Sequence, residues 1–206
     1  MIRLRHNGEE SALEAAGCAH LGELVERCAR SGGSRVVTRV RVNGCDIPED
    51  GLGRLASFPL EGVALIEVET RPPRAVAIAS LDSSASYAAA LVRSLLQTAG
   101  HLRAGRVEAA SRLHAEVTDG LGVFLFAVAA ASSFLGEEGE ALAGLEDELK
   151  PWLETLIAAQ RERDWLRVAD YLEYEVAERV EQWRRRIEEV RRSLPEARAE
   201  VAHDGP

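Results

Sequence analysis

The sequence predicts an α+β protein in which a strand-rich domain, residues 1–72, precedes an antiparallel four-helix bundle, residues 73–206. Apolar residues alternate with polar ones in the first part, the period of a half-buried strand, and recur every three or four residues in the second, the period of a helix. The period changes at Pro72-Pro73, where two missing backbone N–H groups interrupt a strand. These observations divide the chain into two domains.

In the first domain we predict the order strand, strand, helix, strand, short strand, loop and strand. The first strand includes Ile2 and Leu4, and Asn7-Gly8 supplies a hairpin turn. A helix from Leu21 to Cys28 ends at Gly32-Gly33. The remaining strands are predicted at about 10–15, 36–42, 45–47 and 63–68, with a tight turn at 43–44 and a loop at 51–59.

This order and spacing of elements resembles the ubiquitin-type β-grasp fold. Members of that group that are conjugated, or that carry sulfur, end in a free Gly-Gly. Here the last strand continues into Glu69-Thr70-Arg71-Pro72-Pro73, and the chain goes on. We therefore expect a ubiquitin-like domain that is neither a modifier nor a sulfur carrier.

The second domain is predicted to contain helices at about 74–103, 106–135, 138–161 and 165–194, with a frayed tail after about 195. Pro151 falls inside the third helix and is expected to kink or split it, because proline lacks the amide proton. The last helix carries the clearest core stripe. Its members are Trp165, Val168, Ala169, Leu172, Val176, Val180, Trp183, Ile187, Val190 and Leu194.

Composition narrows the classes of function. The chain has 206 residues, 46% of them apolar, and a formal net charge of −9, which argues against charge-driven binding to nucleic acid or anionic membranes. The most apolar run, 121–135, has 15 residues, fewer than the ~20 that span a bilayer, and is interpreted as a buried helix. Three cysteines without CxxC spacing and the absence of a signal peptide predict a cytoplasmic protein.

No pattern in the sequence points to catalysis. The GxSxG, GxxxxGK[ST] and GxGxxG motifs are missing, so neither a catalytic serine nor a phosphate-binding loop is predicted. The five histidines are scattered without the i, i+4 spacing of a helical zinc site. We expect no enzyme, no catalytic residue, no metal and no cofactor.

Tyr174 is the strongest candidate for contact with a protein partner. It lies two residues after Leu172 of the core stripe, on the opposite, polar face of the helix, and amphipathic rings on charged faces are common interface anchors. Tyr171 and Glu178 are its neighbours, and Trp152 and Trp165 could line a groove between helices. A second interpretation stays open, in which Tyr174 packs against the N-terminal domain.

The segment Leu102–Ala110, a helix end followed by a tight turn and a new helix, is similar to the first hairpin of bacterial flagellar export chaperones. The last helix with Trp183 also resembles the last helix of that group. The resemblance implies a non-enzymatic helical bundle that binds an export substrate in grooves between its helices. We expect an adaptor or export chaperone that binds a flagellar or secretion component in such a groove or at the edge of the small sheet. The alternatives are an enzyme with an unfamiliar site in the inter-domain cleft and a structural homo-oligomer, for example a homodimer through the last helix.

Overall fold

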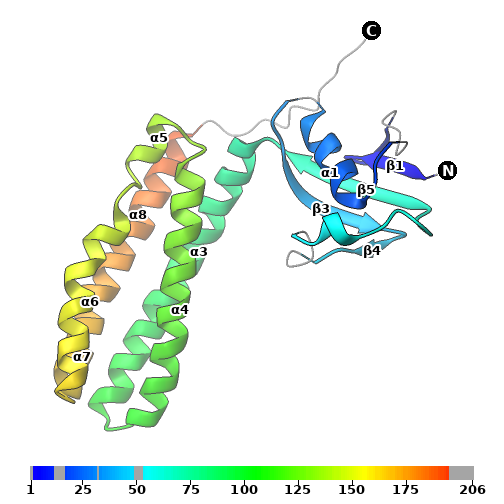
Figure 1. Cartoon of the computed structure of the whole chain (residues 1–206). Helices are drawn as coiled ribbons and strands as arrows, with labels where there is room; N and C mark the ends of the chain where they lie inside the picture. Colours follow the sequence, from blue (N-terminus) through cyan, green and yellow to red (C-terminus); the bar gives the residue numbers. More distant parts are fainter. Residues whose placement is uncertain (1, 12–16, 32, 49–52, 195–206) are drawn as a thin grey trace. The chain divides into compact units, whose positions relative to one another are not determined.

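The computed structural model describes residues 2–11, 17–31, 33–48 and 53–194 (Figure 1). It shows an α+β protein with an N-terminal sheet followed by helices. The chain divides into two compact units, Met1–Val76 and Ala77–Pro206. The predicted boundary, between residues 72 and 73, falls where the first long helix begins.

Within the described residues, the N-terminal unit contains a five-stranded sheet of order β2-β1-β5-β3-β4. Its strands are β1 (Arg3–His6), β2 (Glu9–Glu10), β3 (Val36–Val42), β4 (Cys45–Asp46) and β5 (Leu65–Arg71). β1 and β5 pair in parallel at the centre, and the other neighbours pair antiparallel. The turns at Asn7-Gly8 and Asn43-Gly44 have positive φ at both residues, as two-residue hairpin loops of the I′ type require.

One face of this sheet is covered by the helix α1 (Leu21–Arg30), and the two share an apolar core. Leu21, Leu24, Val25 and Cys28 recur at helical spacing and are buried against Leu4, Val40, Ile66 and Val68, which alternate along their strands. The predicted periods therefore mark the correct faces of both elements.

The observed elements of the N-terminal unit differ from the prediction in several details. α1 ends at Arg30 with Ser31 as its C-cap, and β5 continues to Arg71, three residues beyond its predicted end. A short 3₁₀ helix, η1 (Leu55–Ser57), lies in the predicted loop. Most of the strand predicted at 10–15, and part of the loop predicted at 51–59, lie outside the described residues.

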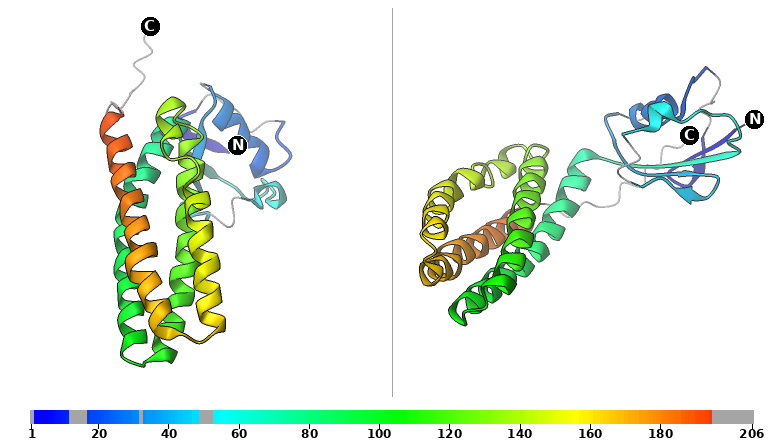
Figure 2. Two further views of the ribbon diagram at one scale, coloured as in Figure 1. Left: turned by 90° about the vertical axis from the view of Figure 1, so that its left-hand side faces the viewer. Right: turned by 60° about the horizontal axis from the view of Figure 1, so that its bottom comes forward.

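The second unit is built from helices that lie side by side (Figure 2). They are α3 (Pro73–Arg103), α4 (Val107–Ser132), α5 (Glu137–Glu140), α6 (Leu145–Arg161), α7 (Trp165–Asp170), the π-helical segment η2 (Tyr171–Val176) and α8 (Ala177–Ser193). The stripe predicted for the last helix is buried from Val168 to Leu194, while Trp165 is half-buried against the same core. Trp183 is completely buried and stacks on Phe124 of α4, with ring centroids 6.2 Å apart.

Two of the predicted helices are interrupted at places that the sequence did not indicate. The helix predicted at 138–161 is broken at residues 141–144, where Gly144 adopts φ 77°, and α6 continues through Pro151. Pro151 therefore does not split the helix. Its missing N–H removes only one intrahelical hydrogen bond, and the packing of the apolar face of α6 stabilises the remaining turns. The last predicted helix is continuous but passes through the π-helical turn η2.

Candidate functional site

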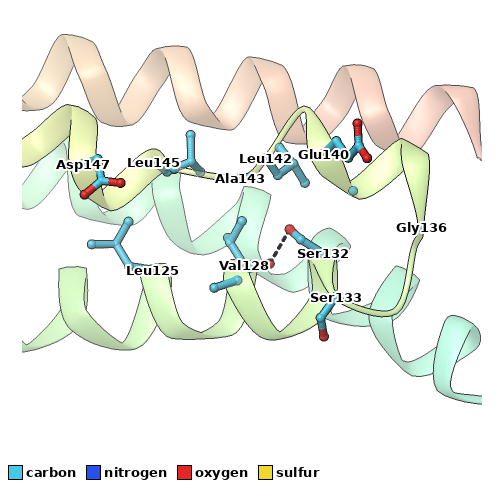
Figure 3. Close-up of a pocket in the computed structure, with 13 residues that line it drawn as sticks. Leu125, Val128, Ser132, Ser133, Gly136, Glu140, Leu142, Ala143, Leu145 and Asp147 are labelled. Atoms are coloured by element: carbon cyan, nitrogen blue, oxygen red, sulfur yellow. Dashed lines mark hydrogen bonds between the residues drawn. The ribbon is translucent and has the colours of Figure 1, made fainter.

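A cavity of about 490 Å³ lies between the second half of α4, α5 and the start of α6 (Figure 3). Its walls are mainly apolar, and Glu140 and Asp147 contribute the carboxylates. Ligand pockets commonly combine an apolar lining with a few polar groups in this way. The residues that line it are Leu125, Val128, Ala129, Ser132, Ser133, Gly136, Gly139, Glu140, Leu142, Ala143, Gly144, Leu145 and Asp147.

The cavity forms because the chain turns sharply after α4 and returns close to it. Ser132 and Ser133 donate hydrogen bonds to the carbonyls of Val128 and Ala130, both at 2.7 Å, so that hydroxyls pair with carbonyls near the helix end. Gly139 in α5 lies so close to the backbone of Ser132 that an added methyl group would overlap its carbonyl oxygen. Only glycine allows this approach, which holds α5 against α4 beside the cavity.

An exposed apolar surface adjoins the cavity on α4. Val123, Phe126 and Ala130 of α4, with Phe134 in the turn just after it, are here called the α4 face; they follow a spacing of three and four residues and are all exposed. The side chains of Val123, Phe126 and Phe134 are 63%, 76% and 53% exposed. Phe126 precedes the cavity residues Ala129 and Ser133 by three and seven positions, so cavity and face are contiguous on one helix.

The prediction that the run 121–135 is a buried helix is therefore wrong for one side of that helix. Leu121, Phe124, Val128 and Ala131 are buried as a core stripe requires. The α4 face is a second apolar stripe that points away from this core. The signal in the sequence was the run 120–136, in which no residue is charged on any side of the helix.

Tyr174 is 62% exposed, as its position opposite the core stripe predicted. The Arg103 guanidinium lies 5.7 Å from its ring centroid and also forms ion pairs with Asp170, at 2.8 Å, and with Glu173. Hydrogen bonds to these two carboxylates raise the pKa of Arg103. The ring thus belongs to a polar cluster that joins the end of α3 to η2.

The other predicted partner residues are dispersed. Tyr171 is half-buried against the core beneath Arg167, whose guanidinium lies 5.7 Å from its ring centroid. Glu178 is exposed and accepts a hydrogen bond from Gln182 at 3.4 Å, and Trp152 is half-buried. Trp165 lines a separate cavity of about 30 Å³. None of these residues lines the cavity beside α4.

His114 of α4 is a half-buried titratable group inside the helical unit. Its Nε2 lies 2.7 Å from Nε2 of Gln160, and its Nδ1 is buried without a hydrogen-bond partner among the described residues. Burial lowers the pKa of His114, because the charged ring would lose its hydration. The residues around it in the small cavity, such as Thr98, Ser111 and Trp165, carry no charge. These surroundings favour the neutral form of the ring.

The described residues contain no group of three or more His, Cys, Asp or Glu side chains that could hold a metal ion. By length and composition, α3 and α4 are each apolar enough to cross a membrane, with 33% of the critical 18-residue window buried. Core helices of water-soluble proteins pass the same test, so the absence of a membrane span stays a prediction.

Comparison with known proteins gives one match. Residues 79–186, from α3 into α8, match the model of a family described as domain of unknown function DUF8042. A search of curated proteins gave no significant match, and a search of solved structures gave none. The matched residues include all of those that line the cavity and all four of the α4 face. The chain belongs to the DUF8042 family.

Proposed function

We propose that this chain is a non-enzymatic protein-binding protein, an adaptor or chaperone, whose helical unit receives an apolar segment of its partner. The observation that carries the proposal is the continuity between the cavity and the α4 face. Contiguous exposed apolar surface is uncommon on soluble proteins and typically marks an interaction site. A helix that lies along Phe126 and Ala130 could insert side chains past Ala129 into the cavity, the arrangement of helix-in-groove recognition.

We also infer that the N-terminal unit is a β-grasp domain and that the helical unit is a four-helix bundle. The strand order β2-β1-β5-β3-β4, the parallel central pair and one covering helix support the first inference. The inference of a four-helix bundle treats α5 and α6 together as one of the four helices, and α7, η2 and α8 together as another. In that arrangement the α4 face lies on the outside of the bundle, where a partner helix would add a further layer.

Photo-cross-linking in cells of the source organism tests the proposed function. A photoreactive phenylalanine is placed at Ala129, which lines the cavity, and in a matched variant at Ala104, which is exposed in the turn between α3 and α4. We expect a discrete protein adduct from position 129 and none from position 104. Equal adducts from both positions, or none from position 129, would contradict binding at the cavity.

A further inference from the structure

The surface that carries the α4 face is strongly acidic at its ends. Residues 107–140 contain six Asp and Glu against one Arg, a balance of −5 with histidine neutral. Glu116 and Asp119 precede the uncharged run 120–136, and Glu137 and Glu140 follow it. All four are exposed, and none of them forms an ion pair with another described residue. Their charge is therefore free to act on a partner.

This charge pattern distinguishes among the occupants that an apolar helix face could have. A second copy would bring its own −5 segment against the first, and like charges oppose that pairing. An anionic membrane surface is disfavoured for the same reason. A helix with an apolar stripe and basic residues meets both the apolar surface and the free carboxylates.

We propose that the α4 face and its cavity bind a basic amphipathic helix of a partner protein, an inference that rests on the proposed function. Apolar side chains of that helix cover Phe126 and enter the cavity, and its Lys or Arg residues approach Asp119 at one end and Glu137 at the other. Asp119 lies 13 positions before Ser132, the last residue of α4, which is about 20 Å at the rise of an α-helix, and Glu137 starts α5 beyond the turn. The partner helix therefore has about four turns or more, with basic residues near its ends.

Fluorescence anisotropy with two designed peptides tests this inference on the full chain. Both peptides have 18 residues and the same leucine stripe, with lysine at the remaining positions of one and glutamine at those of the other. We expect the lysine peptide to bind at least tenfold more tightly at 50 mM NaCl, and its advantage to shrink at 500 mM because salt screens exposed charges.

Matched variants show where the lysine peptide binds. Phe126→Ser should weaken it at least tenfold, whereas Leu166→Ser, at an exposed leucine of α7 (62% against 76% for Phe126), should change it less than twofold. The pair Asp119→Asn with Glu137→Gln should weaken it about fivefold. The pair Glu9→Gln with Glu61→Gln removes the same charge from the N-terminal unit and should have no such effect.

Each other outcome overturns the inference in a recognisable way. Equal affinity for both peptides would refute the charge preference and leave an apolar docking site. Equal losses from both charge pairs, or no loss from Phe126→Ser, would show diffuse attraction of a cation to an acidic protein. A concentration-dependent dimer of the free chain that Phe126→Ser dissolves would assign the face to a second copy. If neither peptide binds, the proposal that a basic helix binds the α4 face is refuted. Cross-linking from Ala129 would still test the proposed function independently.

Discussion

The indole N–H of Trp183 donates a hydrogen bond to the Glu148 carboxylate at 3.1 Å, so the completely buried aromatic ring of α8 is anchored to α6. The other carboxylate oxygen accepts a hydrogen bond from Arg186 at 2.7 Å. The hydrogen bond from Arg186, with smaller contributions from Trp183 and Arg179, lowers the pKa of Glu148. One acidic side chain thus satisfies the polar edge of the largest residue in the core.

Replacing this carboxylate tests its role. Glu148→Ala leaves the buried N–H of Trp183 without a partner, and we expect a loss of about 1–3 kcal/mol in the free energy of unfolding. Glu148→Gln keeps an acceptor and should lose less. Urea denaturation followed by circular dichroism measures both. Equal losses in the two variants would show that charge, rather than the hydrogen bond to Trp183, is what matters.

The same substitution, glycine to alanine, should have opposite effects on stability at Gly139 and at Gly122. A methyl group at position 139 would overlap the Ser132 carbonyl, so Gly139→Ala should destabilise the unit by about 1–3 kcal/mol, as overpacking does. Gly122 lies on the exposed side of α4 with no atom within 4 Å of an added Cβ, so Gly122→Ala should stabilise the helix by up to about 1 kcal/mol. Thermal unfolding of both variants measures the contrast, and a shift of the same sign in both would refute the close approach.

The neutral state of His114 predicts a dependence of stability on pH. Because burial lowers its pKa in the folded chain, the unfolded chain binds more protons as the pH falls through the ordinary value of 6.5. The free energy of unfolding of the helical unit should therefore decrease below that pH. His114→Gln removes the titrating group and should flatten the dependence. Melting curves between pH 7.5 and 5.5 test this, and parallel losses in wild type and variant would assign the effect to other groups.

Val176 and Tyr174 lie two positions apart in η2, and substitution should cost much more stability at the first than at the second. Val176 is buried, so Val176→Asp places an unpaired carboxylate in the core and should cost about 3–5 kcal/mol or unfold the unit. Tyr174→Ala loses the contact with Arg103 and should cost about 0.5–1 kcal/mol. Denaturation of the two variants under one condition is the measurement. A small effect of Val176→Asp would mean that the core stripe is misplaced.

Periodicity predicted most of the fold because burial is what selects the apolar positions. The stripe from Val168 to Leu194 and the alternation in β5 mark core faces whatever the local hydrogen bonding, whereas in β3 only Val40 is buried. Local backbone geometry was harder to predict. A π turn shifts the hydrogen-bond register between Tyr171 and Val176 and leaves the apolar positions in a helical pattern. The break in the helix predicted at 138–161 was expected at Pro151, but it lies just before Gly144. A proline indicates an interruption more clearly than a glycine that adopts a left-handed conformation.

The candidate site was missed for a different physical reason. Apolar residues inside a helix are ordinarily assigned to the core, and residues 120–132 of α4 contain no charge to show which side faces solvent. Phe124 is in helical register with the buried residues Val117 and Leu121, whereas Phe126 lies seven positions after the charged Asp119 and is exposed. Which apolar stripe of α4 is fully buried depends on the number and placement of the neighbouring helices, and that is tertiary information. Aromatic residues on the polar face, such as Tyr174, were more conspicuous and drew the prediction toward η2.

The contact between Gly139 and Ser132 gives a marker that can be followed from one family member to another by reading sequences alone. A homologue with any larger residue at the position of Gly139 must have moved α5 away from the end of α4. In such a homologue the floor of the cavity would be rebuilt. If the cavity serves one purpose throughout the family, glycine at this position and large apolar residues at the positions of Phe126 and Phe134 should be gained and lost together over evolutionary time.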